Sequence, residues 1–127
     1  MIISGQLTKD NFASLRVFIH NPITAVAVEV TAIIDSGAWP CLIQKKISNL
    51  LNLTQESFDE YLHPQEGKKS EPKYLVDLTI GGATLRRLPV TRMDNDAYPC
   101  DLIIGVSCLS TTKFVYDGIN RAFELHL

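Results

Sequence analysis

The sequence predicts an all-β protein, a closed β-barrel or sandwich of about eight strands with one or two short helices. Runs rich in valine, isoleucine, threonine and aromatic residues recur along the chain, and these residue types favour strands. Turn signals such as Gly81-Gly82 and Asp117-Gly118 return every 8–12 residues or so, which is the spacing of all-β domains. The sequence contains no internal repeat and no low-complexity segment.

The first half of the chain contains three strand patterns and one helical pattern. Residues 15–19 predict a short strand that stops at a turn signal. Residues 24–34 predict a long strand that alternates between apolar and polar side chains at its start and is wholly apolar at its end. A strand that begins at the surface and enters the core has this pattern. After a short strand at 41–43, residues 44–51 have apolar side chains at helical spacing, and Asn52 is suited to end that helix.

The second half contains a polar segment and two hairpins. Residues 54–72 are the most polar part of the chain and predict a mobile loop or the tip of a long hairpin. Residues 74–80 and 83–92 flank Gly81-Gly82 and predict a hairpin. The remaining expected elements are a loop at 94–99, a buried strand at 100–104, a short helix at 106–112, and two strands, 113–116 and 120–125, around Asp117-Gly118-Ile119.

Size and charge limit the classes of function. At 127 residues the chain can bury a core of its own, and we expect a single domain spanning residues 1–127. Hydrophobic residues make up 46%, charged residues 20%, and the formal net charge is −2, as in ordinary globular proteins. The basic pairs are scattered and partly offset by acids, so we expect no nucleic-acid partner, which would need a concentrated basic patch. These pairs are Lys45-Lys46, Lys68-Lys69 and Arg86-Arg87.

The sequence also argues against export and against a membrane. Residues 1–5 lack the basic segment and long apolar run with which a secretory signal begins. The longest apolar stretch, 25–34, is interrupted by Glu29 and is too short to span a bilayer. The three cysteines have no framework spacing and suit a reducing compartment, so we expect a cytoplasmic protein. We expect Cys41, Cys100 and Cys108 to be small buried side chains.

The most informative stretch is Ala32-Ile33-Ile34-Asp35-Ser36-Gly37-Ala38, in which an apolar strand runs directly into an acid, a hydroxyl and a glycine. These three residue types also form ordinary turns, so alone the stretch indicates only a strand and a turn. A second buried-strand pattern, Asp101-Leu102-Ile103-Ile104-Gly105, also ends on glycine. Gly105 follows Asp35 by 70 residues, and a short polar and apolar segment comes next.

Together the two motifs resemble those of the retropepsin family, the retroviral-type aspartic proteases and their cellular relatives. In that family an apolar strand delivers Asp-Thr/Ser-Gly-Ala, and a later apolar-apolar-Gly strand passes beside it just before the only clear helix. The resemblance extends from about Leu15 to Leu127. It implies a retropepsin-like closed β-barrel with a flap hairpin, and an aspartic endopeptidase that needs neither a metal nor another cofactor.

The chemistry of this family requires two carboxylates, and this chain carries one Asp-Ser-Gly. The resemblance therefore implies a homodimer that acts on a peptide or protein substrate, with one Asp35 from each copy. It implies that Asp35 is the catalytic acid and base, and that the Ser36 hydroxyl forms a hydrogen bond across the dimer axis. Gly37 allows the backbone to approach the carboxylates closely and to donate its N–H to them.

We assign substrate binding to Ala38, Gly67 and Gly105. The polar segment 61–74 lies where the family has its flap, a hairpin that closes over the substrate and excludes water. Gly67 is the glycine available for the flap tip, although a plain surface loop also fits this segment. Ala38 offers no hydroxyl to the ionised carboxylates, so we expect a mildly acidic pH optimum rather than one below about pH 3.

Two positions depart from the viral pattern. Viral members usually carry an acid after the alanine and an arginine after the apolar-apolar-Gly, where this chain has Trp39 and Val106. Those two groups form salt bridges that support the viral dimer, so a different dimer contact is expected here. Both ends of the chain are apolar, and the family pairs its termini into a sheet between subunits.

Other classes of function fit the sequence less well. The three histidines, His20, His63 and His126, and the three cysteines show no metal-ligand spacing. No G-x-S-x-G is present, and nothing ties a cysteine to a particular histidine, as a serine or cysteine hydrolase would need. The strongest alternative is a catalytically silent retropepsin-like module for dimerisation or peptide binding, because a fold does not fix a function.

Overall fold

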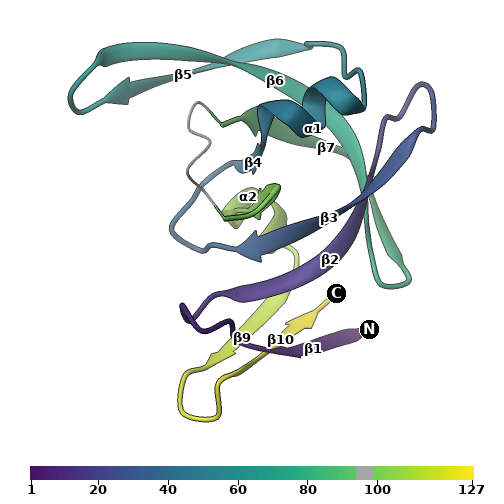
Figure 1. Cartoon of the computed structure of the whole chain (residues 1–127), viewed down its shortest axis with the longest axis vertical. Helices are drawn as coiled ribbons and strands as arrows, with labels where there is room; N and C mark the ends of the chain where they lie inside the picture. The colour runs from purple at the N-terminus through teal and green to yellow at the C-terminus, as the bar shows by residue number, and fades with distance from the viewer. Residues whose placement is uncertain (94–98) are drawn as a thin grey trace.

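The chain forms ten strands and two short helices within residues 1–93 and 99–127, the part that the computed structural model describes (Figure 1). The predicted all-β class is confirmed, whereas the loop expected at 94–99 lies almost entirely outside the described residues. The elements are β1 (Ile2–Gln6), β2 (Ala13–His20), β3 (Ala27–Ile34), β4 (Cys41–Ile43), α1 (Lys45–Leu50), β5 (Ser57–His63), β6 (Gly67–Ile80), β7 (Ala83–Arg92), β8 (Leu102–Ile104), α2 (Val106–Leu109), β9 (Lys113–Asp117) and β10 (Ala122–His126).

Six of these strands close into a barrel in the order β2-β3-β8-β4-β7-β6, because β6 pairs back with β2. Strand β3 pairs antiparallel with β2 along its whole length and parallel with β8 at its end. There Ala32 lies opposite Leu102, and Ile34 lies opposite Ile104. All four side chains are buried, as the wholly apolar ends of both strands predicted. The pairing of β3 with β8 therefore brings the two sequence motifs side by side.

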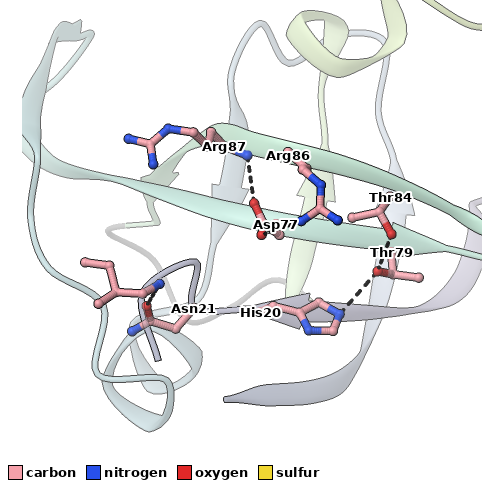
Figure 2. Close-up of polar contacts among 8 residues, drawn as sticks. His20, Asn21, Asp77, Thr79, Thr84, Arg86 and Arg87 are labelled. Carbon is pink, nitrogen blue, oxygen red and sulfur yellow. Dashed lines mark hydrogen bonds and ion pairs between the residues drawn. The ribbon is translucent and has the colours of Figure 1, made fainter. Parts of the chain in front are cut away.

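The seam where β6 meets β2 and β7 carries a polar network (Figure 2). His20 Nε2 lies 3.2 Å from Thr79 Oγ1, which lies 3.0 Å from Thr84 Oγ1. A β-bulge interrupts the pairing of β6 with β7 here, and the N–H of Arg87 donates to Asp77 Oδ1 at 2.8 Å. Bulges bend a strand and increase its twist, which allows β6 to curve from β7 onto β2 and close the barrel.

Strand β5 and the first half of β6 form a long hairpin that projects beyond the barrel (Figure 1). Of the two expectations for residues 54–72, the tip of a long hairpin is therefore the one that holds. The last pair is His63 opposite Gly67, and Gly67 has φ +76°, a left-handed conformation that glycine adopts without strain. Strand β5 escaped prediction because charged residues occur on both of its faces, Asp59 on one and Glu60 on the other.

The two chain ends form a second, three-stranded sheet in the order β1-β10-β9 (Figure 1). Ile2 lies opposite His126, and the N–H of Leu127 donates to the carbonyl oxygen of Met1 at 2.9 Å. The apolar termini thus pair with each other within one chain. The cause is the hairpin after Asp117, which returns β10 between β9 and β1 and so occupies both of its edges.

Both helices are short and stand next to the barrel strands. Helix α1 ends as expected, because Asn52 follows it with φ +51°, and asparagine tolerates this left-handed conformation better than most residues. Helix α2 has four residues rather than the expected seven and is followed by a turn in which the N–H of Thr112 donates to Leu109. In the described part of the chain, no helix has the length and hydropathy needed to cross a membrane.

Among the described residues, the buried apolar side chains form two clusters. The larger one fills the barrel and includes Val17, Ile19, Val76, Leu78 and Ile104. The smaller one contains Ile33, Met93, Cys100 and Ile103, with Ala38 and Leu42 packed against it. It lies immediately behind the turn that follows β3, because Ile33 and Ala38 flank that turn in the chain.

Candidate active site

Asp35 follows the last residue of β3 and is fixed there by its backbone. The N–H of Asp35 donates to the carbonyl oxygen of Ile104 at 3.0 Å, which extends the parallel pairing of β3 with β8 by one residue. Two residues later the backbone turns, and the N–H of Ala38 donates to the carbonyl oxygen of Asp35 at 3.2 Å. Asp35 is partly exposed, and Ser36 and Gly37 are exposed. The partly exposed Asp35 therefore directly follows Ala32-Ile33-Ile34, the buried end of β3.

The Asp35 carboxylate receives one hydrogen bond from the described residues. The N–H of Gly37 donates to Asp35 Oδ1 at 2.8 Å. A Cβ at position 37 would lie 3.1 Å from the same oxygen, which is closer than most Cβ contacts, so glycine gives this turn its close approach. The bond orients the carboxylate at the end of β3.

The back of the Asp35–Pro40 loop is held against the corner between β8 and α2. The N–H of Val106 donates to the carbonyl oxygen of Ala38 at 2.8 Å, and the N–H of Ser107 donates to that of Trp39 at 2.9 Å. Gly105 is buried in this corner, and a Cβ there would lie 2.1 Å from the carbonyl oxygen of Pro40. Only glycine fits, so Gly105 allows the loop to pack against β8.

The two positions that depart from the viral pattern both lie at this loop. Trp39 is 74% exposed although it is one of the largest apolar side chains in the chain. Val106 is half-buried. An indole this exposed beside the Asp35 turn is unusual, since aromatic side chains contribute most to stability and binding when they are covered.

A cavity of about 320 Å³ lies between β4, β7 and β5 of the projecting hairpin. Its charged groups are already paired, because Thr91 donates to Asp59 at 3.2 Å and Arg92 contacts Glu71 at 3.3 Å. The cavity therefore offers a mainly apolar interior. Its lining residues are Pro40, Leu42, Asp59, Tyr61, Thr91, Arg92 and Met93.

This cavity adjoins the Asp35 turn. Leu42 and Met93 line it, and both also pack in the smaller cluster with Ile33 and Ala38, the residues on either side of the turn. None of the lining residues was assigned a role from the sequence. The sequence signal that could have found two of them is the alternation of side chains along β5, which places Asp59 and Tyr61 on the same face of the strand.

The structure thus brings Asp35, Ser36, Gly37, Ala38 and Gly105 together in one corner. Gly67 lies apart from them, at the turn of the projecting hairpin, and apart from its chain neighbours no atom of the described residues lies within 4 Å of where its Cβ would be. The hairpin occupies the place in the chain at which the flap was expected, with β5 contributing to the cavity wall.

No protein-family model and no curated protein sequence matches this chain. Among solved structures, a retropepsin-like aspartic protease from Rickettsia conorii is similar over 98% of this chain and 89% of its own, with 16% identity and a TM-score of 0.71. The EIAV protease complexed with the inhibitor HBY-793 matches at 14% identity and a TM-score of 0.55, over 84% of this chain and 92% of its own. The retroviral protease-like domain of Ddi1 from Leishmania major matches at 19% identity and a TM-score of 0.52, over 84% and 82%. The chain therefore has the fold of the retropepsin-like aspartic proteases.

Proposed function

We propose that this protein is an aspartic endopeptidase of retropepsin type, active as a homodimer. The observation that carries the proposal is the Asp35 turn itself. A partly exposed carboxylate, oriented by the N–H of Gly37, stands at the buried end of β3 in a fold shared with aspartic proteases. The rigid attachment of this turn to β8 and α2 supports the same proposal, because a catalytic group needs a fixed position.

The mechanism uses two Asp35 carboxylates, one from each copy. Carboxyl groups about 3 Å apart do not both ionise, so the pair shares one proton. The ionised partner accepts a proton from a water molecule, which attacks the scissile carbonyl, while the protonated partner donates a hydrogen bond to the carbonyl oxygen. The N–H of Gly37 keeps the ionised carboxylate oriented toward that water.

The dimer brings the two turns together across a two-fold axis. Ser36 is exposed next to Asp35, which suits a hydroxyl that bonds across that axis. Trp39 is exposed on the same loop, and we propose that the partner covers it. Burial of the two indoles then replaces the salt bridges of the viral dimers as a source of affinity.

The substrate is a peptide or protein segment that lies between the Asp35 turns and the projecting hairpin. We propose that Ala38 and Gly67 contact it, and that Gly105 acts from behind the loop by setting its position. The apolar cavity adjoining the turn receives one substrate side chain. We also propose that residues 1–127 form one domain. We propose a cytoplasmic location as well, which the three free cysteines support.

The first experiment combines the mass in solution with a peptidase assay at micromolar concentration. We expect a mass near twice 14.2 kDa, and cleavage of a mixed peptide library that an aspartic-protease inhibitor blocks. A monomer without cleavage under all conditions would contradict the proposal, because one Asp35 has no second carboxylate. A dimer that binds peptides and cleaves none would instead favour the silent binding module.

The cavity predicts that the protease prefers a large apolar side chain at one position of its substrate. Leu42→Phe should reduce its free volume, so kcat/KM for peptides with a large apolar side chain at the selected position should fall about 10- to 100-fold. Peptides with a small side chain there should be cleaved as before. Leu50→Phe is the matched control, because Leu50 is 64% exposed on α1. An equal loss for small and large side chains would show that the cavity does not select the substrate.

A further inference from the structure

A second cavity, of about 310 Å³, lies at the seam of β2, β6 and β7, and we call it the seam cavity (Figure 2). Cross-strand pairing builds its floor, because His20 lies opposite Asp77 and Thr79 lies opposite Thr84. Arg86 completes the floor from β7. The candidate active-site turn follows the other end of β3, roughly 26 Å along that strand. The seam cavity is therefore a separate place on the molecule.

The wall of the seam cavity is a loop whose shape Asn21 fixes. Asn21 is 4% exposed, and its Oδ1 accepts the N–H of Ile23 at 2.9 Å. Its Nδ2 donates to the carbonyl oxygen of Leu51 at 3.0 Å, which ties the loop to the end of α1. Ala25 lines the cavity with φ +61°, a left-handed conformation that is unfavourable for alanine. The loop therefore has a fixed shape, as the wall of a preformed ligand pocket requires.

Two opposite charges face the seam cavity side by side. Arg86 Nη1 lies 3.5 Å from Asp77 Oδ2, at the long limit of a hydrogen bond. The Asp77 side chain is 15% exposed and that of Arg86 is 76% exposed, so the acid lies deeper than the base. Within the described residues the Arg86 side chain makes no other hydrogen bond, so most of its N–H donors are available to a ligand.

The β-bulge of β7 produces this arrangement. It places two residues, Arg86 and Arg87, opposite the single Asp77 of β6. The backbone N–H of Arg87 holds Asp77 Oδ1 at 2.8 Å, while the Arg87 guanidinium turns away from the cavity (Figure 2). Arg87 has φ +53°, which is unfavourable for a residue other than glycine. Bulges re-aim side chains and are frequent next to functional sites, and this one aims a single arginine at the cavity.

The charges of the seam cavity select the class of ligand. A simple anion would approach Arg86 but would be repelled by Asp77, and a simple cation would have the opposite conflict. Among the described residues no group of three His, Cys, Asp or Glu side chains could hold a metal ion. An apolar ligand would remove water from both charges without replacing it. A zwitterion satisfies both charges at once.

We propose that the seam cavity binds a free α-amino acid with a polar, uncharged side chain. The ammonium group of the ligand binds the Asp77 carboxylate, and its carboxylate binds the Arg86 guanidinium. The ligand side chain reaches the hydroxyls of Thr79 and Thr84, which lie 3.0 Å apart and both donate and accept. His20 Nε2, 3.2 Å from Thr79 Oγ1, extends this polar row. The proposal does not rest on the peptidase function.

Titration of the full chain with L-asparagine, followed by NMR, tests the ligand class. We expect saturable binding with a Kd of about 1 mM or tighter. N-acetyl-L-asparagine lacks the ammonium charge and L-asparagine amide lacks the carboxylate, so each should bind at least about tenfold more weakly. No saturable binding of L-asparagine, or equal binding of the two analogues, would overturn the proposal. Tighter binding of inorganic phosphate or of glucose would overturn it as well, in favour of an anion or a sugar site.

Three variants test which side chains hold the ligand. Asp77→Asn keeps an oxygen for the Arg87 N–H, so the bulge should persist, and it should weaken L-asparagine binding at least about tenfold. Arg86→Gln should weaken it by a similar factor, yet leave the binding of L-asparagine amide unchanged, because that analogue has no carboxylate. Arg87→Gln is the matched control and should bind L-asparagine as the wild type does. Equal losses in Arg86→Gln and Arg87→Gln would reveal a general charge effect and refute the site.

Discussion

Asp35→Asn is expected to lower kcat/KM for peptide hydrolysis by at least about 10³-fold while the protein still folds and dimerises. An asparagine amide neither accepts a proton from water nor holds the shared proton of the pair. Its side-chain oxygen has the same shape as the carboxylate and can still accept the N–H of Gly37, so the turn should persist. The measurement is the rate of cleavage at equal dimer concentration, with the solution mass and Tm recorded beside it.

The matched control for this variant is Asp10→Asn, since Asp10 is an exposed aspartate in the turn before β2. Its rate should equal that of the wild type. Unchanged cleavage by Asp35→Asn would show that another group performs the chemistry. If neither the wild type nor Asp35→Asn cleaves, while both bind peptide equally well, the fold serves as a binding module in this protein.

The two strand ends that meet at Asp35 could be predicted from the sequence because their signals are local, whereas their pairing was implied by the family resemblance. Ala32-Ile33-Ile34 and Leu102-Ile103-Ile104 are wholly apolar, which marks strands buried on both faces, and each runs into residues that end a strand. The Gly81-Gly82 hairpin and the end of α1 at Asn52 could be predicted for the same reason. In each case the residue type fixes the backbone conformation over a few positions.

The features that escaped prediction depend on contacts between distant segments. Strand β5 has no uninterrupted apolar face, because Asp59 lies on one face and Glu60 on the other. It is an edge strand that pairs with β6 through the backbone. The lining of the cavity joins residues from three strands, and no periodicity relates Leu42 to Met93. The pairing of the termini within one chain follows from the direction in which β10 returns, which the Asp117-Gly118 turn signal does not specify.

Gly105→Ala is expected to destabilise the protein by at least about 3 kcal/mol, a large effect for one methyl group. The backbone of Gly105 has φ −92°, which alanine adopts without strain, so the cost is steric. The added Cβ would lie 2.1 Å from the Pro40 carbonyl oxygen and 2.7 Å from that of Ala38. Both atoms belong to backbone that is hydrogen-bonded in place, so they cannot move away as a flexible side chain would.

Urea unfolding and Tm measure this loss, and Gly118→Ala is the matched control. The nearest atom to a Cβ at position 118 lies 3.5 Å away, an ordinary contact, so its stability should change by less than about 0.5 kcal/mol. Equal stability of the two alanine variants would mean that the loop is not held where the structure places it. Gly105→Ala should also be less active at temperatures where it remains folded, because the clash displaces the loop that carries Asp35. If the folded Gly105→Ala variant is as active as the wild type, then the packing at Gly105 does not set the position of the Asp35 carboxylate. This result would refute the role of the corner in the site.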